Sequence, residues 1–228
     1  MSVAALVLAA GRGERFGGDV PKAFTLLAGR SLLAHSVRAL AASPEIDLVI
    51  PVVAAERIAA TERELEGLDK LAPPVAGGEQ RQDSMRAGLD ATPEGTAFVA
   101  VHDAARPLVR PEQVSAVVAA AREHGAALLA LPVRDTLKRV RGGRVLESPD
   151  RSEFYAAQTP QVFRIELLRE ALAKASAEGR VATDDASLVE ALGRPVQVVP
   201  GDVENQKITV PSDLAAAEAW LVRRGMLA

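Results

Sequence analysis

Near its beginning the chain reads Ala4-Ala5-Leu6-Val7-Leu8-Ala9-Ala10-Gly11-Arg12-Gly13-Glu14-Arg15. The apolar half of this stretch is too short and too uniformly apolar for a surface helix, and it runs directly into glycine-rich residues. The stretch therefore predicts a buried strand, residues 4–9, followed by a loop of small and basic residues.

Further along the chain, short apolar runs alternate with amphipathic segments rich in Ala, Leu, Glu and Arg. Strands that alternate with helices in this way form parallel sheets, so the pattern predicts an α/β fold with a mostly parallel central sheet flanked by helices. The expected strands are residues 4–9, 47–53, 72–76, 97–102, 126–132 and 195–199. The expected helices are residues 31–42, 55–66, 81–90, 111–123, 165–177, 184–191 and 211–223.

One stretch, residues 133–157, breaks this alternation. Polar residues tolerant of β structure flank the turn dipeptide Gly142-Gly143, which predicts a hairpin of residues 136–140 and 144–147. An insertion of this kind covers a site or embraces a partner subunit. We therefore expect residues 1–228 to form a single domain with one projecting β-hairpin arm.

The composition is that of a folded protein, since 48% of the 228 residues are apolar and 25% are charged. The 27 basic and 30 acidic residues give a net charge of -3, so no chain-wide field favours a nucleic-acid partner. The chain has no cysteine, which excludes disulfides, thiolate metal sites and a cysteine nucleophile, and fits a reducing compartment. Its three scattered histidines argue against a multi-histidine metal site.

No stretch approaches the roughly 18 uninterrupted apolar residues of a membrane helix, so we expect no membrane partner. The apolar start lacks the basic region of a signal peptide, and we expect a cytoplasmic protein. Only five of the 27 basic residues are lysine. In a chain that otherwise prefers arginine, a lysine indicates a position where a compact point charge is useful.

The loop after the first strand has the character of an anion site. Small residues at positions 9, 10, 11 and 13 let backbone N–H groups approach an anion, and Arg15 and Lys22 add positive charge. A dinucleotide fingerprint would need glycine in place of Phe16, and a P-loop would need Ser or Thr after Gly-Lys. The pattern favours phosphate binding over the alternative, a glycine-rich turn with solvated charges.

Two further segments follow predicted strands. Residues 77–88 offer small side chains and exposed amides that suit the edge of a planar base, although Asp83 and Ser84 could equally face solvent in a first helical turn. Asp103 is placed to hold a divalent cation or a substrate hydroxyl. The alternative is an Asp103–Arg106 ion pair that closes the turn. We assign no role to His102, which we interpret as a packed histidine at a strand end.

Other candidate residues lie further along the chain. The arginines of the arm can be ordinary solubilising charges. Thr183 is predicted to cap the helix that follows it and can still lend its hydroxyl to a ligand. Lys207, one of the scarce lysines, is expected on a short strand before the last helix, where function is favoured over solubility.

Seven motifs in order give the chain a specific signature. They are Ala-Ala-Gly-x-Gly-x-Arg with Pro-Lys, Gly-Gly-x-x-Arg-x-x-Ser, His-Asp-Ala-Ala-Arg-Pro, Val-Arg-Asp-Thr-x-Lys-Arg, Thr-Pro-Gln, Thr-Asp-x-Ala-Ser and Lys-Ile-Thr. Over essentially its whole length the chain resembles the 2-C-methyl-D-erythritol 4-phosphate cytidylyltransferase family of the non-mevalonate isoprenoid pathway. The first motif is shared by many nucleotidyltransferases, whereas the ordered set is specific.

The resemblance implies a Rossmann-like nucleotidyltransferase fold and a homodimer joined by the arm. It implies that CTP and methylerythritol phosphate react, with Mg²⁺, to give the cytidine diphosphate derivative and pyrophosphate.

Carried over by motif, the nucleotide-binding residues would be Ala9, Ala10, Gly11, Gly13, Gly78, Glu79, Ser84 and Ala104. The triphosphate would be neutralised by Arg15, Lys22 and Lys207. The acceptor would be bound by Asp103, Arg106 and Thr183, and its phosphate by Thr136 and Arg151 of the other subunit, with Arg151 counted among the catalytic cations. Mg²⁺ would be held by Asp103 or by the CTP phosphates alone.

The departures from the family pattern are Leu8, where proline is common, and Glu79, where aspartate is common. Neither removes a charge, so they bear at most on the geometry around the base. Three other functions stay open: a cytidylyltransferase for ribitol 5-phosphate, a non-catalytic nucleotide-binding regulator, and a dinucleotide-dependent oxidoreductase. The missing fingerprint glycine disfavours the oxidoreductase, and the several converging charges disfavour the regulator.

Overall fold

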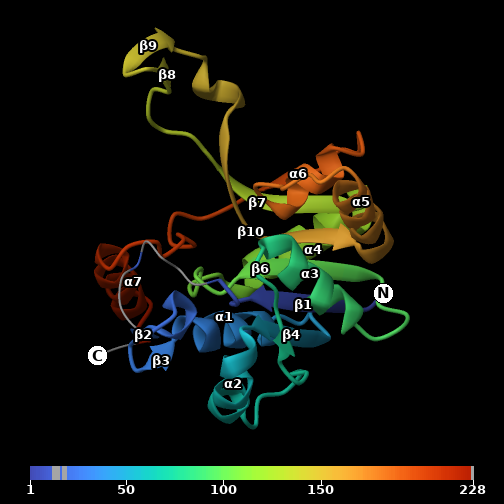
Figure 1. The fold of residues 1–228 in the computed structure, drawn as a ribbon. Helices are drawn as coiled ribbons and strands as arrows, with labels where there is room; N and C mark the ends of the chain where they lie inside the picture. The colour runs from blue at the N-terminus through green and yellow to red at the C-terminus, as the bar shows by residue number, and fades with distance from the viewer. Residues whose placement is uncertain (12–15, 17–19, 227–228) are drawn as a thin grey trace.

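A seven-stranded sheet crosses the molecule, with helices on both of its faces (Figure 1). The computed structural model describes residues 1–11, 16 and 20–226. The strands lie in the order β11-β7-β10-β6-β1-β4-β5. Their bounds are β1 Val3–Leu8, β4 Leu48–Val53, β5 Val75–Ala76, β6 Phe98–Asp103, β7 Ala126–Pro132, β10 Tyr155–Arg164 and β11 Gln197–Pro200.

The sheet is mostly parallel, which confirms the predicted fold class. Strand β1 pairs in parallel with both β4 and β6, and β7 pairs in parallel with β11. Strand β10 is the exception, because it runs antiparallel to both β6 and β7. The sequence did not predict β10, since its central residues Gln158, Thr159 and Gln161 are polar although they are buried.

The helices begin and end close to the predicted positions. Ser31 caps α1 by accepting a hydrogen bond from the backbone of Ala34, and Pro111 opens α4. Their bounds are α1 Leu32–Ala41, α2 Ile58–Leu65, α3 Arg81–Asp90, α4 Pro111–His124, α5 Ile165–Ala177, α6 Asp185–Glu190 and α7 Ser212–Arg223. Short 3-10 turns are η2 Lys22–Phe24, η3 Ala55–Arg57 and η4 Arg151–Glu153. A small sheet of β2 Leu26–Leu27 and β3 Arg30–Ser31 was not predicted.

Both faces of strands β1, β4, β6 and β7 are buried, which explains why these strands are apolar at nearly every position. Leu6 lies beside Ile50 of β4 and Val101 of β6, and these side chains pack with α3, α5 and α6. On the opposite face Val7 packs with α1 and α4. Each such fully buried side chain contributes about 1.5–3 kcal/mol to stability. Helix α7 lies to one side, packed on Leu27 and its neighbours. Across the described residues, no helix has the length and apolar character needed to span a membrane.

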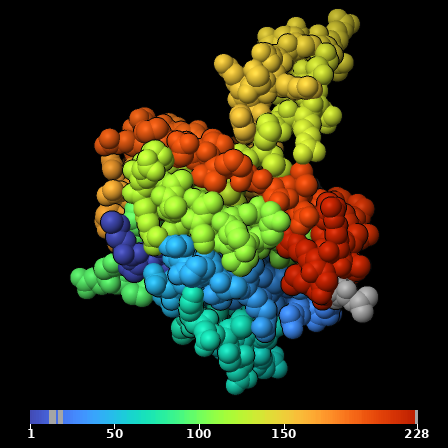
Figure 2. All heavy atoms as spheres, turned by 180° about the vertical axis from the view of Figure 1, so that it is seen from behind, coloured from blue at the N-terminus to red at the C-terminus, as the bar shows by residue number. Residues whose placement is uncertain are grey.

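The predicted arm is present and stands clear of the body, as Figure 2 shows from the opposite side. Strands β8 Arg139–Arg141 and β9 Arg144–Glu147 form the hairpin, so its first strand is shorter than expected. Gly142 and Gly143 both have positive φ, of 56° and 74°. Tight hairpin turns require this conformation, which glycine adopts easily.

Several local expectations were wrong. The strand expected at 72–76 is reduced to its last two residues, and Lys207 lies in an extended loop rather than a strand. Asp184, not Thr183, caps α6, because its carboxylate accepts from the backbone of Ser187. The carboxylate competes better than the hydroxyl because a charged acceptor makes the stronger bond to an N–H group.

His102 is fully buried at the end of β6, as the sequence predicted. Its Nε2–H donates to the carbonyl of Arg106 at 3.1 Å, and its Nδ1 accepts from the hydroxyl of Thr159 at 3.0 Å. The carbonyl can only accept, so Nε2 carries the proton of the neutral ring and Nδ1 is the acceptor, while the same hydroxyl accepts from the backbone of Asp103. Burial lowers the pKa of His102 to about 4. The neutral ring therefore ties β6 to β10.

This burial predicts a stability loss in mild acid. Between pH 6.5 and about 4 the unfolded chain takes up a proton on His102 that the folded chain does not, so the free energy of unfolding falls as the pH falls. The expected loss from this residue is on the order of 3 kcal/mol. Urea unfolding measured at a series of pH values should show a shallower pH dependence in His102→Gln than in the wild type. His124→Gln, at an exposed histidine of α4, is the control, and equal slopes for His102→Gln and the wild type would contradict the prediction.

Candidate active site

A cavity of about 190 Å³ opens at the edge of the sheet where β1 and β6 end. Parallel strands place their carboxyl ends at one edge, and the backbones beyond them stay joined, since Ala104 N donates to Leu8 O at 3.1 Å. Predicted residues that line this cavity are Ala9, Ala10, Gly11, Lys22, Gly78, Glu79, Ser84, Asp103, Ala104 and Lys207. The structure thus gathers five segments that are distant in the sequence.

Glycine at position 77 lets two walls of the cavity meet. A Cβ atom there would lie 2.6 Å from Cβ of Ala10 and 2.7 Å from Oγ of Ser84, both closer than real contacts. The loop after β1 can therefore pack against the start of α3 only because this residue has no side chain. Gly78 is constrained similarly, since a Cβ atom there would lie 2.4 Å from Cβ of Asp83.

The start of α3 settles the two interpretations of its polar residues. Asp83 accepts from the backbone of Gln80 at 3.2 Å and so closes a capping box. Ser84 is almost fully buried on the cavity wall, and its hydroxyl lies 3.3 Å from the carbonyl of Gln80. Asp83 is thus a capping residue, whereas Ser84 lines the cavity.

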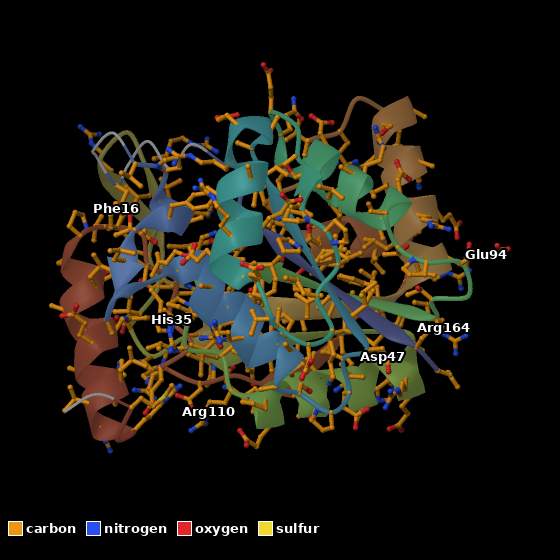
Figure 3. All side chains as sticks on the ribbon, turned by 90° about the horizontal axis from the view of Figure 1, so that it is seen from below. Phe16, His35, Asp47, Glu94, Arg110 and Arg164 are labelled. Atoms are coloured by element: carbon orange, nitrogen blue, oxygen red, sulfur yellow. The ribbon has the colours of Figure 1, made fainter. Side chains whose placement is uncertain are left out.

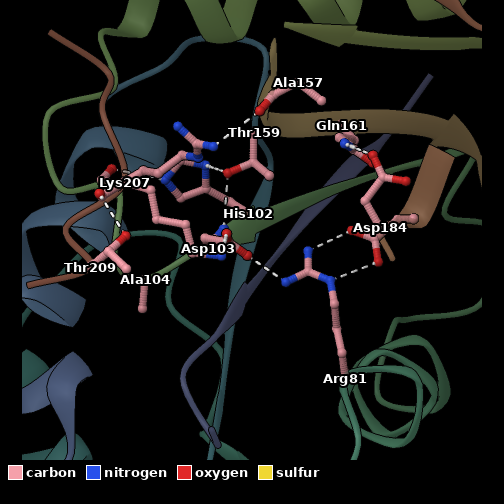
Figure 4. A network of polar contacts seen from close by, with 12 residues as sticks. Arg81, His102, Asp103, Ala104, Ala157, Thr159, Gln161, Asp184, Lys207 and Thr209 are labelled. Atoms are coloured by element: carbon pink, nitrogen blue, oxygen red, sulfur yellow. Dashed lines mark hydrogen bonds and ion pairs between the residues drawn. The ribbon is translucent and has the colours of Figure 1, made fainter. Parts of the chain in front are cut away.

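Four charged side chains form a row of ion pairs beside the cavity, and Figure 4 labels three of them, Arg81, Asp103 and Lys207. Arg81 donates two hydrogen bonds to Asp185, at 3.1 Å from Nε and 2.7 Å from Nη2. Its Nη1 forms an ion pair with Asp103. The other oxygen of Asp103 lies 2.6 Å from Nζ of Lys207. The charges therefore alternate in the order Asp185, Arg81, Asp103, Lys207.

The alternation keeps the central groups of the row ionised. Burial alone would raise the pKa of Asp103, but the positive charges of Arg81 and Lys207 hold that pKa well below its usual range. Burial alone would lower the pKa of Arg81, but Asp185 and Asp103 raise it. Asp103 is therefore a carboxylate at neutral pH.

Arg106 does not pair with Asp103 as the turn-closing alternative expected. Its guanidinium donates to the backbone carbonyls of Asn205, at 2.8 Å, and Ala157, at 3.1 Å. It therefore lies behind the cavity wall, where it ties the segment that carries Lys207 to β10. An extended loop needs such a tie, because it has no ladder of its own to hold it.

Three other predicted residues lie away from this cavity in the same chain. Thr136 and Arg151 are exposed on the arm, where Arg151 donates to the carbonyl of Arg134. Thr183 is exposed before α6. Gly13 and Arg15 lie outside the described residues.

Sequence reasoning missed Arg81 and Asp185. Arg81 occupies the first position of α3, where the helix dipole disfavours a cation. This unfavourable placement was a sign in the sequence that Arg81 has a partner outside its helix. Asp185 was interpreted with Asp184 as a pair that complements the dipole of α6, but only Asp184 caps the helix. Asp185 instead turns inward, where it is almost fully buried against Arg81.

Two carboxylate residues, Glu79 and Asp103, line the cavity. Among the described residues, no group of three or more His, Asp or Glu side chains could hold a metal by itself. Both oxygens of Asp103 already contact cations, although a carboxylate has lone pairs to spare. This donor set fits a Mg²⁺ ion that is held mainly by ligand phosphates, the usual arrangement for Mg²⁺ with nucleotides.

Comparison with known proteins decides the family. The model of the 2-C-methyl-D-erythritol 4-phosphate cytidylyltransferase family matches residues 3–223. The chain belongs to this family. The enzyme of that name from Pelotomaculum thermopropionicum is 47% identical to it, over 99% of this chain and 97% of that one. The enzyme from Desulforamulus reducens is 44% identical, over 98% and 97% of the two chains.

Solved structures agree with the family in fold. The 4-diphosphocytidyl-2C-methyl-D-erythritol synthase of Anaerococcus prevotii superimposes with a TM-score of 0.86 at 30% identity, covering 97% of this chain and 99% of that one. The cytidylyltransferase of Thermus thermophilus gives 0.75 at 36% identity, with 98% of each chain covered. The resemblance found in the sequence and the nucleotidyltransferase class are thus confirmed.

The close contact at Gly77 yields a test of the cavity geometry. Gly77→Ala should lower the free energy of unfolding by about 1–3 kcal/mol, because the new methyl group must push the loop after β1 away from α3. Gly11→Ala is the matched control, since a Cβ atom at Gly11 would meet no atom of the described residues within 4 Å. Urea unfolding of both variants measures the difference, and equal stabilities would refute this packing.

Proposed function

We propose that this chain transfers a cytidylyl group from CTP to 2-C-methyl-D-erythritol 4-phosphate, giving 4-diphosphocytidyl-2-C-methyl-D-erythritol and pyrophosphate. Family membership supports the reaction. The observation that carries the proposal is that one cavity is lined by the small-residue loop, the start of α3, Asp103 and two of the five lysines. These are the groups needed to hold a base and a triphosphate together.

The nucleotide would lie across the wall between β1 and α3. Small side chains allow backbone N–H groups to approach it, and Ser84 supplies a polar edge for the base. This wall is formed by Ala9, Ala10, Gly11, Gly78, Glu79, Ser84 and Ala104. Lys22 and Lys207 lie at the same cavity, where they would neutralise the triphosphate with Arg15. Gly13 is assigned by its place in the family motif.

The chemistry needs no general base or covalent nucleophile. A phosphate oxygen of the acceptor is ionised at neutral pH and attacks the α-phosphorus in line, which displaces pyrophosphate. The protein therefore has to position two polyanions and stabilise the charge that grows on the phosphoryl oxygens. Lys207 suits this task, because an ammonium group has three donors and can hold Asp103 and a phosphate together.

Mg²⁺ is proposed as the cofactor and would be held mainly by the CTP phosphates, with Asp103 as its candidate protein ligand. When bound, it would supply positive charge that offsets the negative charge of the phosphates. The described side chains do the positioning. The absence of cysteine fits the reducing cytoplasm, where we place the reaction.

The acceptor site requires a second copy of the chain. Asp103 faces the cavity, and Arg106 and Thr183 are assigned to the acceptor by motif, although Arg106 now acts through the backbone it holds. Thr136 and Arg151 are on the arm, which stands clear of the body of its own chain (Figure 2). The arm also exposes Val140, Val145 and Leu146. We propose a homodimer in which these apolar residues are buried and Arg151 serves the neighbour's cavity.

Pyrophosphate release is the direct test of the reaction. Turnover should be fast with CTP, Mg²⁺ and methylerythritol 4-phosphate, and slow when ATP, GTP or UTP replaces CTP. Preference for ribitol 5-phosphate would keep the chemistry and change the acceptor. No release with any pair would leave only the nucleotide-binding regulator.

The two cavity lysines should each matter to the rate. Lys22→Ala and Lys207→Ala should lower kcat on the order of 10²–10³-fold, by analogy with the loss of one oxyanion donor. Both variants should keep the circular dichroism spectrum of the wild type. Lys174→Ala, whose lysine lies on the surface of α5, is the control and should keep full activity. Near-wild-type turnover in either cavity variant would remove that lysine from the mechanism.

The shared site predicts complementation between inactive chains. Lys207→Ala and Arg151→Ala should each be inactive alone, because every site lacks one cation. After mixing and subunit exchange, the heterodimer has one site with both cations, so activity should return. Light scattering should report a dimer for each protein. A monomer, or a mixture that stays inactive, would show that Arg151 does not serve a neighbour.

A further inference from the structure

A second cavity, of about 240 Å³, lies beside the segment that leads from β6 to α4. Its walls come from α1, from the later half of that segment and from α7. It shares no lining residue with the first cavity, whose wall uses the earlier half, Asp103 to Ala105. Figure 3 labels His35 and Arg110, which lie on its walls between α7, α1 and α4.

Part of the wall of this cavity is apolar. Leu108, Val109 and Leu221 contribute, and each is only 2% exposed, so they form a firm surface rather than mobile side chains. Met226 adds a flexible thioether side chain that can adapt to an occupant. A surface of this kind recognises the hydrocarbon part of a ligand.

The remaining wall is strongly positive. Four arginines line the cavity, and none of its described lining residues is acidic. Two of the four are neutralised from behind: Arg110 pairs with Asp202, and Arg224 pairs with Glu204 at 2.7 Å and donates to the carbonyl of Leu108 at 2.9 Å. The other two, Arg30 and Arg38, come from β3 and α1.

Arg30 and Arg38 lack a partner of this kind among the described residues. Within that part of the chain, no carboxylate lies within 4 Å of either guanidinium. The Nε atom of Arg38 is buried without a hydrogen-bond partner. A buried donor without a partner is unfavourable, so binding of an acceptor at this guanidinium is favoured.

His35 lines the same cavity as Arg30 and Arg38. Its Nε2–H donates to the carbonyl of Leu27 at 2.7 Å, which holds the ring in place. Burial lowers the pKa of His35, and the nearby charges of Arg30 and Arg38 lower it further, whereas the carbonyl of Leu27 and the charge of Glu64 partly offset this. The neutral imidazole therefore leaves Nδ1 as an acceptor beside these two cations.

We propose that this cavity binds a small ligand that carries one phosphate or carboxylate group on an aliphatic body. The anion would lie against Arg30 and Arg38, and the aliphatic body would cover Leu108, Leu221 and Met226. A bare inorganic anion would leave the apolar wall unused, and a neutral hydrocarbon would leave the two guanidinium groups unpaired. The site is additional to the cytidylyl-transfer cavity and does not depend on its assignment.

The chain contains its own reporter for this test. Trp220 is the only tryptophan, and it directly precedes Leu221 on α7. Octyl phosphate, kept below its micelle concentration, should change the fluorescence of Trp220 in a saturable way. Inorganic phosphate and octanol should each bind at least tenfold more weakly, because each supplies one half of the recognition. Equal binding of octanol, or no binding of octyl phosphate, would overturn the proposal.

Variants locate the probe. Arg38→Gln should weaken octyl phosphate binding at least tenfold, and Ala39→Leu should weaken it by filling the cavity. Arg63→Gln, at an exposed arginine of α2, is the matched control and should bind like the wild type. Lys207→Ala should also leave the affinity unchanged. A lower affinity in Lys207→Ala would mean that octyl phosphate binds in the first cavity. Equal affinity of Arg38→Gln and the wild type would mean that Arg38 does not contact the anion. Either result would refute the site.

Discussion

The row of alternating charges from Asp185 to Lys207 is the constraint on which the arrangement of the site depends. It joins α6, α3, β6 and the loop before α7 in a single line of ion pairs. Asp103 and Asp185 are almost fully buried, and an ion left without its partner in such a place typically costs about 3–5 kcal/mol. The four segments can therefore move apart only by exposing a buried charge.

The row also fixes what a ligand meets at the cavity. Its inner members neutralise one another, whereas the side chain of Lys207 at its end is 42% exposed and lies on the cavity wall. A cation held in place before a polyanion arrives does not have to be reorganised during the reaction, and this preorganisation is the main source of electrostatic catalysis. The same geometry explains why a lysine serves here: a compact ammonium can share its donors between Asp103 and a phosphate.

Behind the row, buried polar groups replace the apolar packing found elsewhere in the sheet. Thr159 bonds both the backbone of Asp103 and the ring of His102, and Arg106 bonds carbonyls on two other segments. Such a network defines positions more sharply than apolar contacts, because each group has a direction as well as a volume. The segment after β6 is thereby held between two cavities of different chemistry, one lined by the row and one by arginines.

By itself the sequence determined the parallel sheet, the helices, the Gly-Gly hairpin and the family, because periodicity, caps, turn residues and ordered motifs are all local. It also placed Ala9, Gly78, Ser84 and Asp103 at strand ends, from which their meeting at one edge follows. It could not predict β10, since the buried residues Gln158, Thr159 and Gln161 are polar and find their partners on other elements. It could not pair Arg81 with Asp185, 104 positions away, or bring Lys207 to Asp103. Only the tertiary structure decided these contacts, because a charge row exists only once the chain has brought its members together.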